Sequence, residues 1–343
     1  MQNMAWSEEL LNEMLTQPSE QLIQCMARLK GDIMVLGAGG KMGPDICVLA
    51  QKASDAAGVK RKVYAVSRFS DKEAEKQLND HQVQTISMDL LQPGNLDKLP
   101  DCENIIFMAG KKFGTAGNEY LTWGMNSWLP CNVAQRYKNS RIVVFSSGNL
   151  YPKVETSSGG VTESVKPAPV GEYPMSCLAR ERAFEYAAKA LGTKVAIMRL
   201  NYAIDLRYGV LHDIAQQILH HEPINLAAMP CFNCIWQKDA NEAALRMLEH
   251  ASEDVFILNV TGPETAGVRE TAVKLAELLG EKVEFIGEPA QTAYLNNAGK
   301  MCKMMGYPHV PLDTLIDWQA QWLLAGGRSL GKPTHFEERE GNY

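Results

Sequence analysis

Short apolar runs alternate with amphipathic segments from residue 31 to about residue 205. Six runs have the length and composition of buried strands, at residues 33–36, 62–66, 83–90, 104–110, 141–145 and 194–200. Between several of these runs, apolar residues recur every three or four positions, which is the spacing of one helix face. The alternation of strands and helices predicts an α/β fold class with a doubly wound parallel sheet.

Two short helices are predicted ahead of the first strand, in an N-terminal helical arm of residues 1–30. Ser7 and Ser19 each stand where a side chain can cap the start of a helix, and Pro18 separates the two segments. We expect this arm to be structural and to pack on the sheet or on a partner subunit.

The composition of the chain argues against nucleic-acid-binding and membrane-spanning proteins. The 343 residues are 45% apolar, which is enough for a sizeable core in one large or two modest domains. The formal net charge of −6 argues against a nucleic-acid surface. No leader-like segment opens the chain and no apolar run approaches about 18 residues. We therefore expect a cytoplasmic protein with no nucleic-acid and no membrane partner, and its eight scattered cysteines are predicted to be reduced thiols.

A glycine-rich turn follows the first predicted strand and opens a predicted helix. Gly37 permits a tight turn, Gly40 leaves no side chain before a pyrophosphate, and Gly43 lets the helix approach the strand. Free N–H groups of the first helical turn then face the phosphates. The turn predicts a dinucleotide site contacting Gly37, Gly39, Gly40, Lys41, Met42 and Gly43. An ordinary glycine-rich βα turn is the alternative.

The end of the second predicted strand bears on the choice of cofactor. An acid would bind the ribose 2′-hydroxyl of NAD, but Ser67 and Arg68 stand there instead. A hydroxyl beside a guanidinium suits a 2′-phosphate, so NADP is favoured over NAD. In the alternative, Arg68 is solvated and Asp71 takes the ribose role.

The next two strand ends extend this predicted site. Asp89 and Leu90 end the third strand, where we expect them to touch adenine. Ala109 and Gly110 end the fourth strand, and their small size leaves room for the cofactor.

In their order along the chain, these motifs resemble the extended short-chain dehydrogenase/reductases of the NAD-dependent epimerase/dehydratase family. The resemblance covers roughly residues 31–325. Besides the segments above, it rests on Phe145-Ser146-Ser147 with Tyr151, Arg199-Leu200-Asn201-Tyr202, and the segments at 235–240 and 256–262.

The resemblance implies a domain organisation. Residues 31–205 would form an NAD(P)-binding Rossmann domain, and strands within residues 231–262 would complete its sheet. Residues 206–330 would form a smaller C-terminal substrate-binding region. The polar tail of residues 331–343 is expected to be ordered only against a neighbour.

The resemblance also implies roles for single residues. Ser147 would polarise a substrate hydroxyl or carbonyl, and Tyr173 would be the catalytic acid/base. The remaining implied contacts are Ser146, Asn126 and Tyr173 itself for the cofactor, and Ser147, Asn149, Arg199 and Asn201 for the substrate. In the alternative for Asn126, its side chain caps a helix or packs in the interior. The segment that contains Arg199 and Asn201 lacks one residue of the family pattern.

Cys177 departs from the family pattern. The family places a lysine four residues after the tyrosine, where it lowers the phenol pKa and binds the nicotinamide ribose. A neutral thiol does neither. Lys111, Lys112 or Arg180 can supply the charge from elsewhere, and we favour Lys112 because Arg180 has to span about two helical turns, roughly 10 Å. In the alternative, the lysines are solvated and hydride chemistry is lost.

Two further candidates favour structural roles. Cys231 and Cys234 form a lone Cys-x-x-Cys behind His220 and His221, but adjacent histidines on a helix point to different faces. We therefore predict no metal. Asp239 is predicted to cap a helix over residues 240–250.

The predicted function is an NAD(P)-dependent oxidoreductase or epimerase that acts by hydride transfer on a hydroxyl or ketone. By resemblance, the substrate is sugar-like or a nucleotide sugar. The alternative is a catalytically impaired dinucleotide-binding protein with a sensor or scaffold role. Resemblance also implies a homodimer through helices near residues 120–137 and 175–190, although the apolar stripe of Leu178, Phe184 and Ala188 could instead face the sheet.

Overall fold

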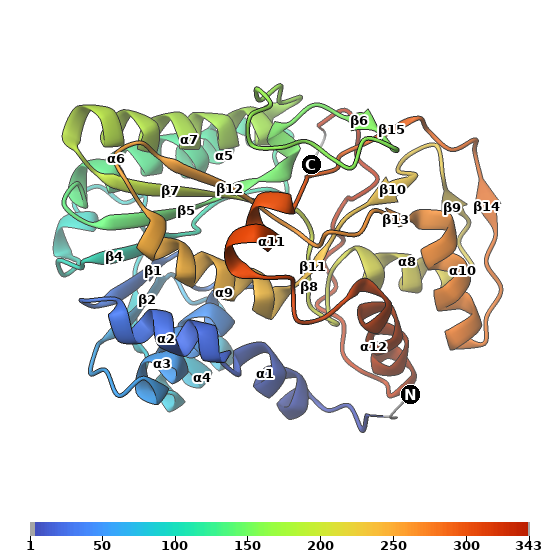
Figure 1. The fold of residues 1–343 in the computed structure, drawn as a ribbon, viewed down its shortest axis with the longest axis horizontal. Helices are drawn as coiled ribbons and strands as arrows, with labels where there is room; N and C mark the ends of the chain where they lie inside the picture. Colours follow the sequence, from blue (N-terminus) through green and yellow to red (C-terminus); the bar gives the residue numbers. More distant parts are fainter. Residues whose placement is uncertain (1–3, 342–343) are drawn as a thin grey trace.

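A seven-stranded parallel sheet forms the centre of the computed structural model, which describes residues 4–341 (Figure 1). The strands lie in the order β12-β7-β5-β4-β1-β2-β3. Their bounds are β1 (Ile33–Leu36), β2 (Val63–Ser67), β3 (Gln84–Ser87), β4 (Asn104–Phe107), β5 (Arg141–Ser147), β7 (Lys194–Leu200) and β12 (Phe256–Val260). This is the doubly wound Rossmann order, and it confirms the predicted fold class.

Helices cover both faces of the sheet because its strands are apolar on both sides (Figure 1). Alternate β1 residues point to opposite cores: Val35 packs on one face and Met34 on the other. One face is covered by α3 (Gly43–Ala56), α9 (Gln237–Met247) and α4 (Lys72–Asp80). The other is covered by α6 (Leu129–Arg136), α7 (Glu172–Leu191) and the short helix η1 (Leu96–Lys98).

The helix leading into α6 is irregular. It begins with α5 (Glu119–Trp123) and continues through one π-helical turn, η2 (Gly124–Trp128). The sequence predicted a helix near residues 120–137, and the helical segment begins at Glu119. Asn126 lies in the π-helical turn and is fully buried.

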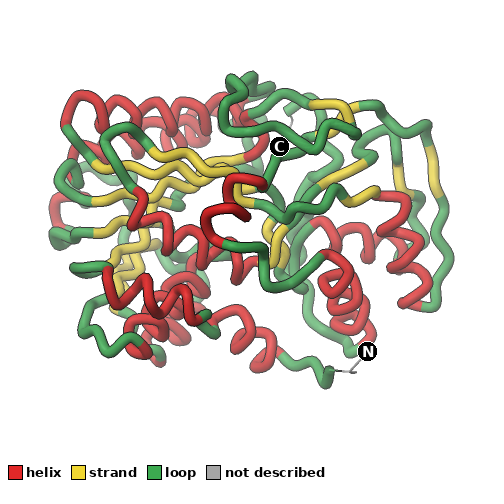
Figure 2. The backbone as a smooth tube through the Cα atoms, in the orientation of Figure 1, coloured by secondary structure: helices red, strands yellow, loops and turns green. Residues whose placement is uncertain are grey.

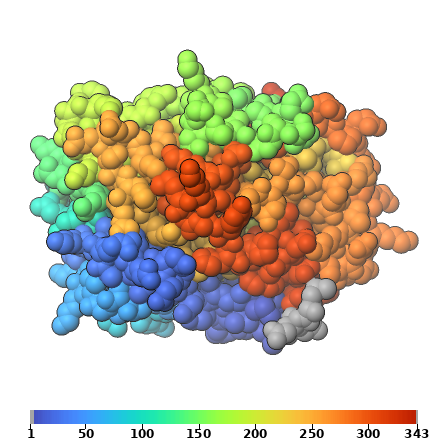
Figure 3. Space-filling model, viewed as in Figure 1, coloured from blue at the N-terminus to red at the C-terminus, as the bar shows by residue number. Residues whose placement is uncertain are grey.

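The N-terminal arm has the two predicted helices, α1 (Glu8–Thr16) and α2 (Glu20–Arg28). Ser7 Oγ accepts a hydrogen bond from the Leu10 N–H, and Ser19 Oγ accepts one from the Leu22 N–H, both at 3.2 Å. Both helices contact α3 and α9. In the space-filling view the arm lies along the lower edge, beside the last third of the chain (Figure 3).

A third core lies beyond the carboxyl ends of the sheet strands (Figure 2). It gathers α8 (Val210–Leu219), α10 (Val268–Leu279) and α12 (Leu312–Leu324), while α11 (Gly299–Met305) packs on the sheet side. Trp236 and Trp322 are the largest side chains in the third core. Two-stranded ladders tie this half together: β6 (Val154–Glu155) with β15 (Thr292–Ala293), β8 (Ala203–Ile204) with β11 (Ile235–Trp236), β9 (Ile224–Asn225) with β14 (Phe285–Ile286), and β10 (Cys231–Phe232) with β13 (Ala266–Gly267).

The C-terminal tail lies against its own chain, so the expectation that it needs a neighbour is wrong. Phe336 is buried in the third core. Arg339 donates hydrogen bonds to the backbone oxygens of Ala228 and Thr292, at 2.9 and 2.8 Å. These contacts fix the tail across the carboxyl end of the sheet.

Within residues 4–341, no helix combines the length and apolar content that crossing a membrane requires.

Candidate functional site

A cleft of about 1340 Å³ opens at the carboxyl ends of the sheet strands. Its walls come from the glycine turn after β1, the loops after β4 and β5, the start of α7, the segment after β7 and the C-terminal tail. Ligands of open α/β sheets bind at this edge. Of the predicted site residues, the cleft brings together Gly37, Gly39, Gly40, Lys41, Met42, Gly110, Lys112, Ser146, Ser147, Asn149, Tyr173 and Asn201.

The glycine turn has the close approaches that its sequence predicts. A Cβ on Gly37, whose φ is +96°, would lie 2.5 Å from the Ala109 backbone nitrogen. A Cβ on Gly43 would overlap the Ala38 oxygen, so the helix is as close to the turn as glycine allows. Gly40 has only the Gly37 oxygen nearby, at 3.6 Å, and it borders the open cleft. The turn therefore presents bare backbone to a ligand at the start of α3.

Tyr173 and Ser147 meet at one wall of the cleft. Tyr173 lies in the first turn of α7 and Ser147 ends β5, and both residues line the cleft. Burial raises the pKa of the Tyr173 phenol well above its usual value, and the neighbouring Cys177 thiol raises it further. Arg180 and Ser147 oppose this effect, because each lowers the pKa of the phenol. The pair has the geometry of a proton-exchanging phenol beside a polarising hydroxyl.

Arg180 reaches this wall despite its distance along α7. Its guanidinium donates hydrogen bonds to the Phe145 backbone oxygen at 2.7 Å and to Asn126 Oδ1 at 2.6 Å. A Cβ on Gly110 would lie 2.6 Å from Arg180 Nη2, so only glycine leaves room for it. An extended arginine spans the two helical turns, so Arg180 lines the cleft together with Lys112. The preference for Lys112 as the charge partner of Tyr173 stays a prediction.

Asn126 holds the fourth-strand loop and Arg180 together. Its amide accepts from the Lys111 N–H at 2.9 Å and donates to the Lys111 oxygen at 2.8 Å. Its Nδ2 also donates to Ser176 Oγ at 2.9 Å. Asn126 is buried and is not among the residues that line the cleft. In this structure its role is to position other groups.

Lys112 also lies near the Tyr173 ring. Its Nζ donates a hydrogen bond to the Thr334 backbone oxygen at 3.0 Å and lies 5.9 Å from the centre of the Tyr173 ring. Enclosure by the protein lowers the pKa of Lys112 to about 8. Lys112 thus lines the cleft as predicted, but it is also tied to the tail.

Arg199 does not face the cleft. It is buried and forms an ion pair with Glu181 of α7, with Nη2 to Oε2 at 2.6 Å. Ser146 Oγ donates to the other oxygen of the same carboxylate at 2.6 Å. A buried charge needs a partner of this kind. The expectation of an Arg199 substrate contact is therefore a misassignment, because this side chain fastens α7 to the sheet.

Asn149 and Asn201 border the cleft near Ser147. Both are almost fully buried. Asn201 Nδ2 donates to Asn233 Oδ1 at 2.6 Å, so it is oriented by the segment between β10 and β11.

Ser67 and Arg68, which were predicted to select the cofactor, are not among the residues that line the cleft. Ser67 Oγ is the atom that a Cβ on Gly39 would strike, and Arg68 is exposed at the end of β2. Asp71 lines the cleft, and its Oδ1 caps α4 through the Glu73 and Ala74 N–H groups. Asp89 and Leu90 follow β3 and do not line the cleft.

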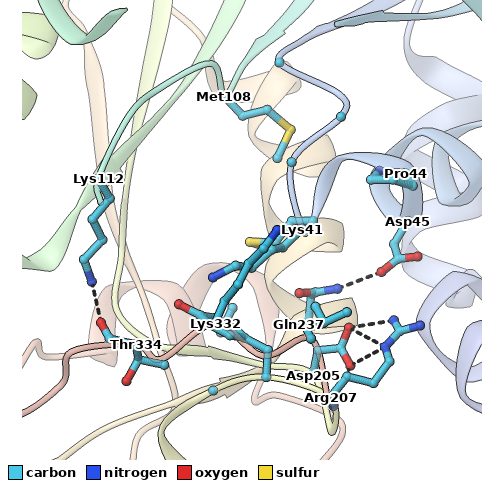
Figure 4. Close-up of a pocket in the computed structure, with 18 of the residues that line it drawn as sticks. Lys41, Pro44, Asp45, Met108, Lys112, Asp205, Arg207, Gln237, Lys332 and Thr334 are labelled. Carbon is cyan, nitrogen blue, oxygen red and sulfur yellow. Dashed lines mark hydrogen bonds and ion pairs between the residues drawn. The ribbon is translucent and has the colours of Figure 1, made fainter. Parts of the chain in front are cut away.

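Sequence reasoning missed the contribution of the tail. Figure 4 shows Lys41, Lys112 and Lys332 around one hollow. Burial, together with the charges of Lys112 and Lys332, lowers the pKa of Lys41 to about 7. Tyr208 lies under the Lys41 ammonium, with its ring centre 3.1 Å from Nζ. Nothing in the local sequence near residue 41 indicates a partner almost 300 positions away.

The helix that follows β11 tests the capping role predicted for Asp239. Asp239 lies inside α9, which starts at Gln237, so the prediction that it caps this helix is wrong. Its carboxylate instead pairs with His309 Nδ1 at 2.6 Å, and this hydrogen bond raises the pKa of His309. Among residues 4–341, no three His, Cys, Asp or Glu side chains gather as a metal ion would require.

Residues 33–260 match the model of the NAD dependent epimerase/dehydratase family. A comparison with curated proteins finds no match.

Several solved structures share the fold at low sequence identity. The UDP-glucuronic acid 4-epimerase from Bacillus cereus, in complex with NAD, is 19% identical with a TM-score of 0.71, over 87% of this chain and 99% of that one. The dTDP-glucose 4,6-dehydratase from Bacillus anthracis strain Ames, in complex with NAD, is 16% identical with a TM-score of 0.71, over 86% and 97%. The UDP-glucose 4-epimerase of Thermus thermophilus, also with NAD, is 18% identical with a TM-score of 0.68, over 84% and 97%.

Proposed function

Because the chain belongs to the NAD-dependent epimerase/dehydratase family, we propose that it is an NAD(P)-dependent oxidoreductase or epimerase. It acts on a hydroxyl or ketone of a sugar-like or nucleotide-sugar substrate. The observation that carries this proposal is that Ser147 and Tyr173 line the same cleft as the glycine turn.

The residues of the cleft fit a nicotinamide dinucleotide. Gly40 and Gly39 leave bare backbone beside the start of α3, where the dipole and free N–H groups of the helix attract a pyrophosphate. When bound, the cofactor supplies hydride transfer at C4 of its nicotinamide.

The protein's own groups handle the proton. The Tyr173 phenol exchanges it with the substrate hydroxyl, and Ser147 Oγ holds the substrate oxygen. Arg180 stabilises the phenolate, because its positive charge lowers the pKa of Tyr173. The loop after β4 closes the site from the side of Lys112.

A substrate screen tests this proposal. The purified protein is incubated with oxidised NAD or NADP and with panels of sugars, uronic acids and nucleotide sugars, and the absorbance of reduced nicotinamide is followed. Substrate-dependent reduction, or interconversion of epimers found by chromatography, supports the proposal. Tight cofactor binding without turnover across all panels would contradict it.

One observation favours the second candidate, a dinucleotide-binding sensor or scaffold. Cys177 replaces the lysine of the family motif, and burial raises the pKa of Tyr173. In that case the protein binds cofactor and changes conformation or partner without turnover. Any turnover that depends on Tyr173 excludes this candidate.

Cofactor preference follows from the end of β2. Arg68 is exposed there, and no acid occupies the strand end. We expect NADP(H) to bind at least about tenfold more tightly than NAD(H), a difference of ~1.4 kcal/mol, because Arg68 pairs with the 2′-phosphate. Arg68→Ala should erase most of this gap in fluorescence titrations, whereas Arg269→Ala, on α10, should keep it. Equal affinities in the unmutated protein would end the idea.

Assembly follows from apolar side chains on the helices that cover one sheet face. Phe184 and Ala188 are buried on the sheet side, so the stripe on α7 that includes them packs inward. Other apolar side chains of α5, η2 and α7 are exposed, including Tyr120, Trp128, Met175 and Tyr186.

We propose that this surface joins two copies of the chain. Sedimentation at micromolar concentration should show a homodimer, and Trp128→Glu should shift it toward the 38 kDa monomer. Tyr307→Glu, which changes an exposed tyrosine near α11, is the matched control. A monomer alone in the unmutated protein would rule out the dimer.

A further inference from the structure

Three lysines from distant parts of the chain converge on the cleft. Lys41 belongs to the glycine turn, Lys112 to the loop after β4, and Lys332 to the C-terminal tail. Figure 4 shows their side chains around one hollow, with Lys41 extending toward Lys332 and away from the start of α3 at Pro44. The fold therefore concentrates positive charge opposite the start of that helix.

The surroundings of Lys41 disfavour its charged form. Burial is the main reason that the pKa of Lys41 falls to about 7, and the positive charges of Lys112 and Lys332 lower it further. No carboxylate in residues 4–341 forms an ion pair with Lys41 or Lys332. The Lys41 ammonium lies instead over the aromatic rings of Tyr208 and Phe113, 3.1 and 5.1 Å from their centres. An anion between the lysines would relieve this repulsion.

The acids beside the cluster serve other groups. Asp213 accepts hydrogen bonds from the Thr334 backbone N–H at 2.7 Å and from Thr334 Oγ1 at 2.5 Å. Asp205 forms an ion pair with Arg207, at 2.7 Å to Nη2. These carboxylates attract Lys41 at longer range, but their hydrogen bonds hold the tail and the segment after β8. Neither of these two carboxylates forms an ion pair with Lys41 or Lys332.

We propose that Lys41, Lys112 and Lys332 form an oxyanion subsite, so that the substrate carries a carboxylate or a phosphate next to the reacting carbon. This inference rests on the proposed function and narrows its substrate to an acidic sugar or a related hydroxy acid. Lys112 places the subsite beside the acid/base, since its Nζ lies 5.9 Å from the Tyr173 ring centre. Lys332 makes the tail part of the substrate site.

Binding of three sugars that share one ring tests the subsite without needing turnover. Calorimetric titrations of the cofactor-loaded protein use D-glucuronate, D-glucose 6-phosphate and D-glucose, at about 20 mM ionic strength to limit screening. We expect at least one anionic sugar to bind more tightly than glucose, and the tighter of the two identifies carboxylate or phosphate. If neither anionic sugar binds more tightly than glucose, the proposed oxyanion subsite is wrong.

Matched variants assign the effect to the lysines. Lys41→Gln and Lys332→Gln should each weaken the anionic sugar about fivefold and leave glucose binding unchanged. Lys60 is exposed and lies outside the cleft, so Lys60→Gln should leave the affinities for the anionic sugar and for glucose unchanged. Unchanged anion affinity in both cleft variants would overturn the proposal.

In the competing explanation, Lys41 binds the cofactor phosphates and not the substrate, because it belongs to the glycine turn. Cofactor affinity should change less than about twofold in Lys41→Gln. A loss of about tenfold would assign Lys41 to the cofactor phosphates and remove it from the subsite. Anion binding without any turnover would keep the subsite while contradicting the proposed function, so the two failures are distinguishable.

Discussion

Tyr173→Phe is expected to lower kcat by about 10²–10⁴-fold, because it removes the group that exchanges the substrate proton. The ring and its packing at the start of α7 remain, so cofactor affinity should change little. Initial rates of nicotinamide reduction, on the substrate that the screen identifies, measure the effect.

A second tyrosine serves as the control. Tyr307→Phe removes an exposed hydroxyl near α11 and should leave kcat unchanged. If Tyr173→Phe remains fully active, the cleft does not use a phenol as its acid/base, and the proposed chemistry is wrong.

Arg180→Met is expected to shift the pH dependence of kcat toward alkaline pH by at least about one unit, and to slow turnover near neutrality. Arg180 lowers the pKa of Tyr173, so removing its charge raises that pKa. A base with a raised pKa is protonated up to higher pH, and the active fraction near neutral pH falls accordingly. The pH profile of kcat records this shift.

Arg180 is buried, so its replacement needs a companion that keeps the charge. Arg180→Lys should retain most of the normal pH profile, although it loses part of the contact with Asn126 and Phe145. Lys112→Met provides the comparison with our expectation from the sequence. A larger alkaline shift in Lys112→Met than in Arg180→Met would return the role of charge partner to Lys112.

The sheet was predictable because its signals are local. The strands β1 and β7 have the predicted bounds, since each is a short apolar run that can only be buried. Helix α4 was not predicted, because its local sequence lacks such an apolar signal. Its residues are mostly charged, and only Leu78 is buried, so it shows little apolar periodicity.

The site was only partly predictable because several of its residues act through distant partners. Arg199 ends a strand, as a ligand-binding residue often does, but its direction is set by Glu181 on α7. Arg180 depends on the space above Gly110, and Lys332 on the path of the tail. Spacing along the sequence contains none of these three relations, whereas Ser147 and Tyr173 could be placed from their motif alone.

The central claim is that Tyr173 becomes an acid/base although Cys177 replaces the usual lysine. Lowering a phenol pKa by about three units requires ~4 kcal/mol of preferential phenolate stabilisation, which one cation seldom provides. Arg180 and the positive charge of oxidised nicotinamide would act together in an enclosed cleft.

The most direct test is a near-ultraviolet titration of the phenolate, taken as the difference between the unmutated protein and Tyr173→Phe. Without cofactor, the Tyr173 signal should titrate above the usual pKa of about 10, because burial raises its pKa. With oxidised cofactor bound, the account predicts a midpoint lowered by several units, to about 7–9. A midpoint that stays above about 10 with cofactor bound would contradict the account.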